Sequence, residues 1–499
     1  MARGKAPIPI DLPKPIGLNA EGTAGKQESI YSALRESILA GLLATGSQLP
    51  STRSLALRWQ VSRETVEVAF DRLRAEGYVA RRPGSGTTVS TSVPDRLIAA
   101  MAPPAALAKT GRAQPETALQ RLVPDVAVMP GVPFIARLAD PSLFKVEQWA
   151  RQTSGALIAA QPEDLAVCDS RGLAALRSGI ADYLRSFRGI PCDEADIIVT
   201  TGIRHATALV VRALLHPGDT VCVEDPGYVW ARRIVEAHGA KPVSVPVDED
   251  GLVVSALEPW PQAKLVYVTP AHQAPLGVTM AVSRRLELLE WAAAHNAYLI
   301  EDDYDSEFNY NSSPLPALKS IDRVDRVIYV GSFNKTLFAN LRVGYMVAPH
   351  ALRERLTATL ATSERSVGIV EQLGVTALLA SGSFVRHLRT ARQSYQSRRD
   401  LVIAQLGKHT ARPLEITGQQ AGFHFILWLP KGCNDSDFCA RAQRVGIRLQ
   451  TVASFCHSVK LPPGVLIGYT ALSPAKIRHA ARLLAQLLDE SNGGSSHPQ

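Results

Sequence analysis

Apolar residues recur at helical spacing near the start of the chain. Ile30, Leu34 and Ile38 form the apolar stripe of a first expected helix. A second helix is predicted in LPSTRSLALRW, where Ser51 is a natural N-cap, and a third begins after WQVS with Ser62 as its N-cap. Two helices joined by so short a turn have helix-turn-helix spacing.

Beyond the third helix, the segment YVARRPGSGTTVS predicts two short strands around a glycine-rich turn. Strands in this position are the expected wing, so residues 28–90 are predicted to form a winged helix-turn-helix domain. Residues 1–27 and 91–133 are rich in Pro and Gly without periodicity. We interpret them as a disordered arm and a linker.

The pattern changes after residue 133. Short β-rich apolar runs such as IIVTTG, TVCVEDPG, KLVYVTP and RVIYVGS alternate with helical patterns, which predicts a mainly parallel sheet covered by helices. From about Gly368 a helical stretch leads into FHFILWL, GIRLQTV and a final helix, which predicts a smaller α+β subdomain. The expected fold class is multi-domain: the winged helix, then an α/β domain over 134–490 with its small subdomain mainly at 368–490, and a tail at 491–499.

Composition narrows the class of protein. Of the 499 residues, 46% are hydrophobic and 20% charged, and no apolar run approaches the roughly 20 residues that a membrane helix needs. The start of the chain has no apolar stretch like that of a signal peptide, so we expect a cytoplasmic location. The net charge of +8 permits DNA as a partner, although many enzymes are equally basic. The six cysteines are scattered without metal-ligand spacing, so we expect buried thiols and no metal site.

The N-terminus of the third helix is the expected recognition element. Free backbone N–H groups there meet phosphate and the first side chains reach base edges, which places Arg63 and Thr65 on the bases or the DNA backbone. For Arg53 or Arg63 taken singly, a solvated surface charge is an equally good interpretation. The segments LPSTRSLA, VSRETV, AEGYV and RPGSGTTV together resemble the winged-helix domain of the GntR superfamily of bacterial repressors and activators.

This resemblance implies double-stranded promoter DNA as a partner. In that family the counterparts of Arg53, Arg63, Thr65, Gly84 and Gly86 approach DNA. With their neighbours at the two caps and in the wing, the expected DNA-binding residues are Ser51, Thr52, Arg53, Ser62, Arg63, Thr65, Gly84, Ser85 and Gly86.

The segment YVGSFNKTLFANLRVGY carries a lysine in a small-residue turn after a predicted strand. Lysine forms imines with carbonyl compounds, and a lysine at a strand end beside hydroxyl and guanidinium groups suits a pyridoxal-phosphate site. Lys335 is the expected imine former, and Ser332 and Arg342 are the expected phosphate ligands. A lone lysine in a loop is usually a surface residue, so this interpretation depends on the rest of the site.

That remainder lies about thirty residues upstream, in YLIEDDYDSEF. A carboxylate beside the pyridine nitrogen keeps it protonated, and a tyrosine hydroxyl can bond to the phenolic oxygen of the ring. Asp302 and Tyr304 are assigned these roles. Asp303 is the alternative to Asp302, because the register of the strand end is open.

Two further segments complete the expected site. VEDPGYVWARR places Tyr228 after a strand, where it can stack on the pyridine ring, with a packed turn aromatic as the alternative. TTGIRHATALVV opens a helix whose N–H groups can bind phosphate, with Gly202, Ile203 and Arg204 as the donors. The run VTPAHQAPLGVTM is expected to line the same cleft.

These segments, with DSRGLAALRSGIADYLRSFRGI before them, resemble the aminotransferase-like domain of the MocR/GabR subfamily, GntR-type regulators fused to a fold-type I pyridoxal-phosphate domain. The resemblance covers about residues 28–90 and 140–490. It implies pyridoxal 5'-phosphate as cofactor and a domain-swapped homodimer. It also implies a regulator that senses an amine or amino-acid effector through aldimine exchange at Lys335, with weak or residual transaminase activity at most.

The chain departs from the family pattern at two places. Asn334 precedes the lysine where the family usually has serine. Aminotransferases carry an arginine near the final strand that clamps a substrate carboxylate, but PGVLIGYTALS contains none. Recognition of a carboxylate would therefore need another residue, such as Arg448 or Arg204.

Two other functions compete with a regulator. A working aminotransferase with an N-terminal appendage would use the same site residues, and a DNA-binding protein could keep a dead cofactor domain as a dimerisation scaffold. The winged helix disfavours the first, because a free enzyme has no use for a recognition helix and wing. The intact charged site residues disfavour the second.

Overall fold

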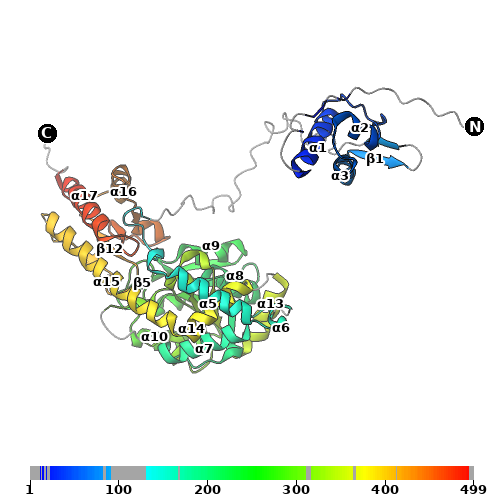
Figure 1. Ribbon diagram of the computed structural model, residues 1–499. Coiled ribbons are helices and arrows are strands. Elements are labelled where there is room, and N and C mark those ends of the chain that lie inside the picture. Colours follow the sequence, from blue (N-terminus) through cyan, green and yellow to red (C-terminus); the bar gives the residue numbers. More distant parts are fainter. Residues whose placement is uncertain are drawn as a thin grey trace, which may run out of the picture. The chain divides into compact units, whose positions relative to one another are not determined.

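The computed structural model divides into two compact units, residues 1–121 and 122–499 (Figure 1). It describes residues 12, 14–15, 18, 23–82, 86–91, 131–166, 169–310, 316–363, 367–411 and 413–493. The linker predicted at 91–133 therefore lies almost entirely outside the described residues. Each unit is presented by itself.

The N-terminal unit is the predicted winged helix-turn-helix. Its elements are α1 (Thr23–Leu39), α2 (Thr52–Trp59), α3 (Arg63–Ala75), β1 (Val79–Arg82) and β2 (Gly86–Val89). The strands pair antiparallel, with Val79 opposite Val89. The predicted stripe of α1 is buried in a single core with Trp59 and Phe70. Helical periodicity therefore identified the inward faces correctly.

The described residues of the predicted arm are partly packed. Helix α1 begins at Thr23, inside the stretch assigned to disorder. Leu12 and Leu18 are 5% and 6% exposed and belong to the core of the unit. The prediction of disorder over 1–27 is wrong at these residues, because isolated leucines in a proline-rich stretch can still pack on a neighbouring core.

An eight-stranded sheet forms the centre of the second unit, in the order β3-β10-β9-β8-β7-β4-β5-β6. Strand β10 is antiparallel to both neighbours, β6 is antiparallel to β5, and the other pairs are parallel. The predicted mainly parallel sheet is confirmed. The strands are β3 (Ile197–Thr200), β4 (Thr220–Asp225), β5 (Lys241–Asp248), β6 (Gly251–Leu252), β7 (Leu265–Val268), β8 (Tyr298–Asp303), β9 (Val327–Ser332) and β10 (Gly344–Val347).

Helices cover both faces of this sheet, because its strands are apolar on both sides. Alternate strand residues such as Ile300 and Val330 pack against α8 (Ile203–Leu214), α9 (Val229–Ala237) and α13 (Arg353–Ser363). Their neighbours, such as Leu299 and Tyr329, pack on the opposite face. The helices there are α7 (Ala174–Arg188) and α10 (Val282–Ala294), with α5 (Val146–Ala159) and α14 (Ile369–Ala380) outside α7.

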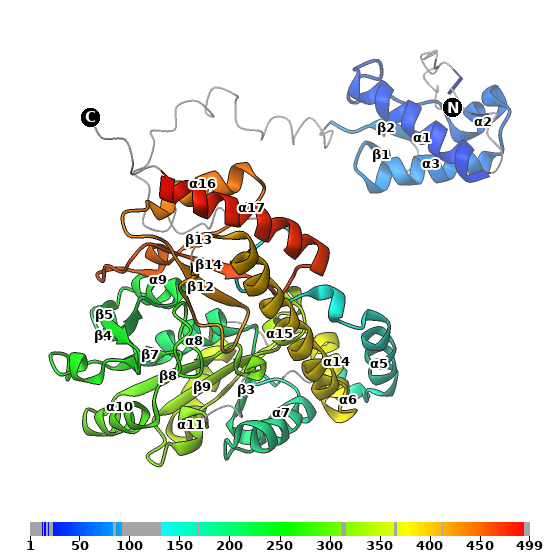
Figure 2. The same ribbon diagram turned by 90° about the vertical axis from the view of Figure 1, so that its left-hand side faces the viewer.

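A four-stranded antiparallel sheet closes the unit, in the order β11-β12-β14-β13. Helix α15 packs along α17, beside α16 (Figure 2). The bounds are β11 (Ile416–Thr417), β12 (His424–Trp428), β13 (Gln450–Thr451), β14 (Gly464–Gly468), α15 (Ser383–His409), α16 (Asp435–Arg444) and α17 (Pro474–Gly493). Because α14 packs on α5 and α7, the predicted start of the small subdomain at Gly368 is too early. Within the described residues, none of the helices combines the length and hydropathy that a bilayer crossing requires.

Candidate cofactor site and nucleic-acid interface

Lys335 lies in α12 (Phe333–Thr336), a single helical turn directly after β9. The Ser332 hydroxyl caps this turn by accepting a hydrogen bond from Asn334 N at 3.1 Å. Lys335 Nζ donates to the carbonyl oxygen of Arg137 at 2.5 Å. Burial, together with the positive charge of Arg137, lowers the pKa of Lys335 to about 8. A much larger share of this amine is therefore unprotonated near neutral pH than for an exposed lysine.

The two adjacent acids at the end of β8 lie on opposite faces of the sheet. The Asp302 carboxylate accepts a hydrogen bond from the Tyr267 hydroxyl at 2.5 Å, and burial raises its pKa to about 7. Asp303 pairs instead with Arg188, 2.5 Å away, and its pKa is held low by that guanidinium despite its burial. The negative charges of Asp305 and Asp302 act on Lys335, whereas Asp303 is not among the main influences on it. The geometry therefore favours Asp302 over Asp303 as the acid of the site.

Tyr228 is the N-cap residue of α9 and lies over the Tyr267 ring, with centroids 6.3 Å apart and planes 23° apart. Its hydroxyl accepts a hydrogen bond from Arg204 Nε at 3.3 Å. The exposed Arg204 guanidinium also lies 3.8 Å from the centre of the Trp230 ring. Tyr228 and Tyr267 thus form an aromatic wall beside Asp302.

The N-terminus of α8 meets the turn that carries Lys335. Gly202 has φ +126°, and a Cβ there would come 2.8 Å from Asn334 Nδ2. Asn334 donates to the carbonyl of Thr201 at 3.1 Å and accepts from Val343 N at 2.9 Å. Asn334, which stands where the family usually has serine, therefore links its own turn to the loops that carry Thr201 and Val343.

The predicted phosphate ligands differ in the hydrogen-bond donors that they can offer to a phosphate. The N–H of Gly202 is donated to the Thr200 hydroxyl at 3.2 Å, so Gly202 leaves space for a ligand but its own N–H is already used. Ile203 and Arg204 begin the helix, where backbone N–H groups have no intrahelical acceptor. Arg342 is exposed with φ +52°. It precedes Gly344, which pairs with both Ser332 and Thr200, so Arg342 enters the same end of the sheet.

Tyr304 contacts a buried pair that the sequence interpretation did not single out. Its hydroxyl lies 3.2 Å from His272 Nδ1, and His272 Nδ1 lies 2.8 Å from the Asp305 carboxylate. Asp305 raises the pKa of His272 against the opposing effect of burial. His272 and Asp305 lie in VTPAHQAPLGVTM and YLIEDDYDSEF, two segments that the sequence already assigned to the site. Their pairing could not be predicted, because the two segments are far apart in the sequence.

These residues fit the three groups of pyridoxal phosphate. Lys335 could supply a half-buried amine for the aldehyde, and Asp302 a buried acid for the pyridine nitrogen. The space kept open by Gly202 beside the Ser332 hydroxyl, at a helix N-terminus, suits the phosphate. A side chain at position 202 would fill that cradle.

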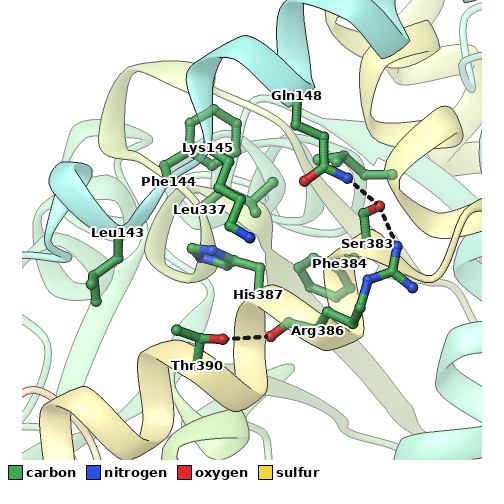
Figure 3. A pocket seen from close by; sticks show the side chains of 11 residues that line it. Leu143, Phe144, Lys145, Gln148, Leu337, Ser383, Phe384, Arg386, His387 and Thr390 are labelled. Atoms are coloured by element: carbon green, nitrogen blue, oxygen red, sulfur yellow. Dashed lines mark hydrogen bonds between the residues drawn. The ribbon is translucent and has the colours of Figure 1, made fainter.

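A small pocket of about 80 Å³ is lined in part by Leu337, two residues after Lys335 (Figure 3). His387 enters it and lies 2.8 Å, Nε2 to oxygen, from the carbonyl of Thr336. Ser383 accepts hydrogen bonds from Arg386 and Gln148, drawn dashed in the figure. The pocket lining includes Leu337 but not Lys335, so this pocket is separate from the predicted site.

The first turn of the recognition helix in the N-terminal unit carries an exposed arginine and a buried threonine. Ser62 caps α3 by accepting from Thr65 N at 3.1 Å, as expected. Arg63 is exposed and paired with Glu67, four residues on, at 2.8 Å. Thr65 is only 2% exposed, and its hydroxyl lies 2.7 Å from that of Ser62. The predicted contact of the Thr65 side chain with DNA is therefore not supported by this structure. The side chain is buried, and both its hydroxyl and its backbone N–H are engaged with Ser62.

The remaining predicted contacts lie at the second helix and the wing. Ser51 caps α2 by accepting from Ser54 N at 3.1 Å, and Thr52 donates to Glu67 at 3.5 Å. Arg53 is exposed at the first turn of α2. Gly86 has φ +80° at the start of β2, and Gly84 and Ser85 lie outside the described residues.

Two family models match the chain, one for each unit. The model described as bacterial regulatory proteins, gntR family, matches residues 26–89. The model described as aminotransferase class I and II matches residues 138–484. The two matches agree with the winged helix and with the large sheet and its closing subdomain.

Among curated proteins, two regulators are similar to almost the whole chain. The probable rhizopine catabolism regulatory protein MocR of Rhizobium meliloti is 33% identical over 488 residues, which cover 95% of this chain and 97% of that protein. The pyridoxine biosynthesis transcriptional regulator PdxR of Corynebacterium glutamicum is 34% identical over 458 residues, 91% of this chain and 94% of that protein. Among solved structures, the multiple substrate aminotransferase of Thermococcus profundus matches with a TM-score of 0.68 and 25% identity, over 76% of this chain and 96% of that one.

Proposed function

The chain belongs to the MocR-type members of the gntR family, DNA-binding transcription regulators in which a winged helix is joined to an aminotransferase-like domain. From this membership we propose that it binds pyridoxal phosphate at Lys335 and changes its binding to promoter DNA when an amine-bearing effector reaches that site. The observation that supports this most is the half-buried Lys335 amine, on which the charges of Asp305 and Asp302 act, in a chain that also carries a recognition helix.

Each part of the proposed site has its own task. When bound, pyridoxal phosphate would supply an aldehyde that captures primary amines reversibly. Lys335 would hold that aldehyde until an effector amine takes its place, and its side chain would take up the proton that the effector amine gives up. Asp302 holds the protonated pyridine nitrogen, and Tyr267 keeps the carboxylate in place. Ser332, the α8 N-terminus and Arg342 hold the phosphate.

Release of Lys335 changes the charge and the contents of the site. After release, the site contains both the free lysine amine and the bound effector. Before release, it contains the lysine but no effector. An effector can shift a conformational equilibrium only if it binds one conformation better than the other. We propose that the favoured conformation alters how a pair of winged helices in a homodimer, domain-swapped as the family resemblance implies, engages two DNA half-sites.

Transaminase turnover is a second candidate function, supported by the same lysine and by the likeness to aminotransferase structures. Turnover requires the α-carbon of the substrate to be held in position for proton transfer. In this chain Gly468, Tyr469 and Thr470 stand at the end of the final strand, where an arginine clamp would be needed. We therefore propose a sensor with slow turnover or none.

The experiment uses the full chain loaded with pyridoxal phosphate. Borohydride reduction followed by peptide mapping should find the adduct on Lys335, and Lys335→Ala should abolish it, whereas Lys264→Ala, a change at an exposed lysine before β7, should not. Promoter binding is then measured with and without amines that change the cofactor absorbance. An adduct on another lysine, or an amine effect on DNA binding that is equal in wild type and Lys335→Ala, would contradict the proposal.

A further inference from the structure

Arg137 carries a positive charge beside Lys335 that is not balanced by an acid. It is half-buried, its carbonyl accepts the hydrogen bond from Lys335 Nζ, and its guanidinium lies 4.8 Å from the centre of the Phe455 ring. The largest charge effects on it come from Tyr228, Tyr304 and Arg204, and none of these is a carboxylate. Among the described residues it forms no ion pair. A guanidinium enclosed without a carboxylate is costly unless a ligand supplies the anion.

The segment that carries Arg137 is fixed against the final strand of the small sheet. Phe134 forms an isolated bridge with Gly468, and Gly468 N donates to the Phe134 carbonyl at 3.1 Å. A Cβ at Gly468 would collide with the carbonyl oxygen of Ile135. Thr470 donates to the carbonyl of Leu138. The strand end that lacks an arginine is thus covered by a segment that brings one.

The backbone of Arg137 points to a functional reason for this residue. Its φ is +62°, in the left-handed region that residues other than glycine rarely adopt. Such a conformation persists when the surrounding structure determines it, and it is concentrated at binding sites. Here the bridge to Gly468 on one side and the contact with Lys335 on the other hold the residue in place.

The two arginines suggested by the sequence are less well placed. Arg204 is exposed, bonded to the Tyr228 hydroxyl and stacked on Trp230 at the helix end proposed for phosphate. Arg448 donates its backbone N–H to the carbonyl of Pro133, and no contact joins its side chain to Lys335 in the described part of the chain. Arg137 alone of the three contacts the lysine directly, through its backbone carbonyl, and its charge is the largest electrostatic influence on Lys335.

We propose that Arg137 binds an anionic group of the effector, so that the signal is an amine that also carries a carboxylate or sulfonate rather than a plain amine. This inference rests on the proposed function of Lys335. Strand β14 lacks the arginine that clamps a carboxylate in aminotransferases. In this proposal Arg137 takes that role, from the segment that is bridged to β14. The ammonium of the ligand then meets the cofactor side of the site while its acid meets the guanidinium.

The test compares matched amines on the full chain loaded with pyridoxal phosphate. Alanine, β-alanine and taurine carry an acid, and ethylamine does not; affinities come from the visible absorbance of the cofactor and, independently, from calorimetry. Wild type should bind at least one of the acidic amines more tightly than ethylamine. Arg137→Gln should weaken that binding about 10- to 100-fold relative to ethylamine, the usual effect of losing a charged hydrogen bond. Ethylamine is the internal reference, because any change in Lys335 itself affects all the amines alike. The ratio of β-alanine to taurine distinguishes carboxylate from sulfonate.

Two further variants control for structure. Arg137→Lys keeps the charge and should recover part of the preference, and Arg448→Gln should behave as wild type. Equal weakening of all amines in Arg137→Gln, or no preference for acidic amines in wild type, would overturn the inference while leaving the proposed function intact. If no amine changes the absorbance of wild type, the proposed function fails, and calorimetry of the acidic amines on wild type and Arg137→Gln then decides the role of Arg137 separately.

Discussion

The hydroxyl of Tyr267 donates a hydrogen bond of 2.5 Å to the carboxylate of Asp302, and both side chains are buried on the same face of the large sheet. Burial opposes the charge on Asp302, whereas this hydrogen bond favours it. The pair therefore keeps a carboxylate in a buried place, as the proposed contact with a cationic ring nitrogen requires.

We expect Asp302→Asn to weaken pyridoxal-phosphate binding by about 10- to 100-fold, because it removes a buried charged hydrogen bond to the ring. Tyr267→Phe should weaken it less, by about 3- to 10-fold, because the carboxylate remains but loses one stabilising donor. The measurement is an absorbance titration of cofactor-free protein. Unchanged affinity in both variants would remove Asp302 from the site.

The neighbouring acid should behave in the opposite way. Asp303 and Arg188 form a buried ion pair, with side chains 1% and 4% exposed. Asp303→Asn leaves the guanidinium without its charge partner, so the free energy of unfolding should fall by about 3–5 kcal/mol. Asp302→Asn should cost far less stability, because burial already disfavours its charge.

Thermal and urea unfolding of the two variants provide the comparison. A larger loss of stability in Asp302→Asn than in Asp303→Asn would contradict the assignment of one acid to the cofactor and the other to the core.

Local chemistry explains why much of the fold was predictable. Ser51 and Ser62 cap helices through neighbours within three residues, so a short window of sequence contains the whole interaction. Lys335 follows β9 and Asp302 lies at the end of β8, and the carboxyl ends of parallel strands lie at one edge of a sheet. These positions depend on one strand and its end, which a pattern can show.

The rest depended on contacts between distant segments. Arg137 meets Lys335 across 198 positions of sequence, and no periodicity relates them. Thr65 was assigned to DNA because it follows the cap, but the rotation of α3 on its core buries it. The choice between Asp302 and Asp303 required the strand register, which is set by pairing with β7 and β9.

Arg63 provides a test of the DNA interface. It is exposed and held by Glu67 on its own helix, so removing it should not disturb the core. Arg63→Ala should weaken specific promoter binding by about 1–3 kcal/mol per half-site, as expected for loss of a base-reading arginine. Cofactor binding and the melting temperature should stay the same.

Arg74, exposed at the other end of α3 and paired with Asp71, is the matched control. Binding of Arg74→Ala to specific and random DNA of equal length should resemble that of wild type in a gel-shift titration. If Arg63→Ala retains the full preference for the promoter, the recognition role of this residue is wrong.

The pKa of Lys335 predicts the pH dependence of cofactor capture. Burial and the charge of Arg137 disfavour the ammonium and lower this pKa from 10.5 to about 8. Only the unprotonated amine attacks the cofactor aldehyde. The capture rate should therefore rise about tenfold per pH unit below pH 8 and level off above it.

Stopped-flow mixing of cofactor-free protein with pyridoxal phosphate gives this profile, and a lysine analogue in the same buffers corrects for ionisations of the cofactor itself. Arg137→Gln removes a neighbouring positive charge, so the midpoint of its rate profile should move to higher pH. A midpoint near 10.5 in wild type, or a midpoint at lower pH in the variant than in wild type, would contradict this account of the lysine.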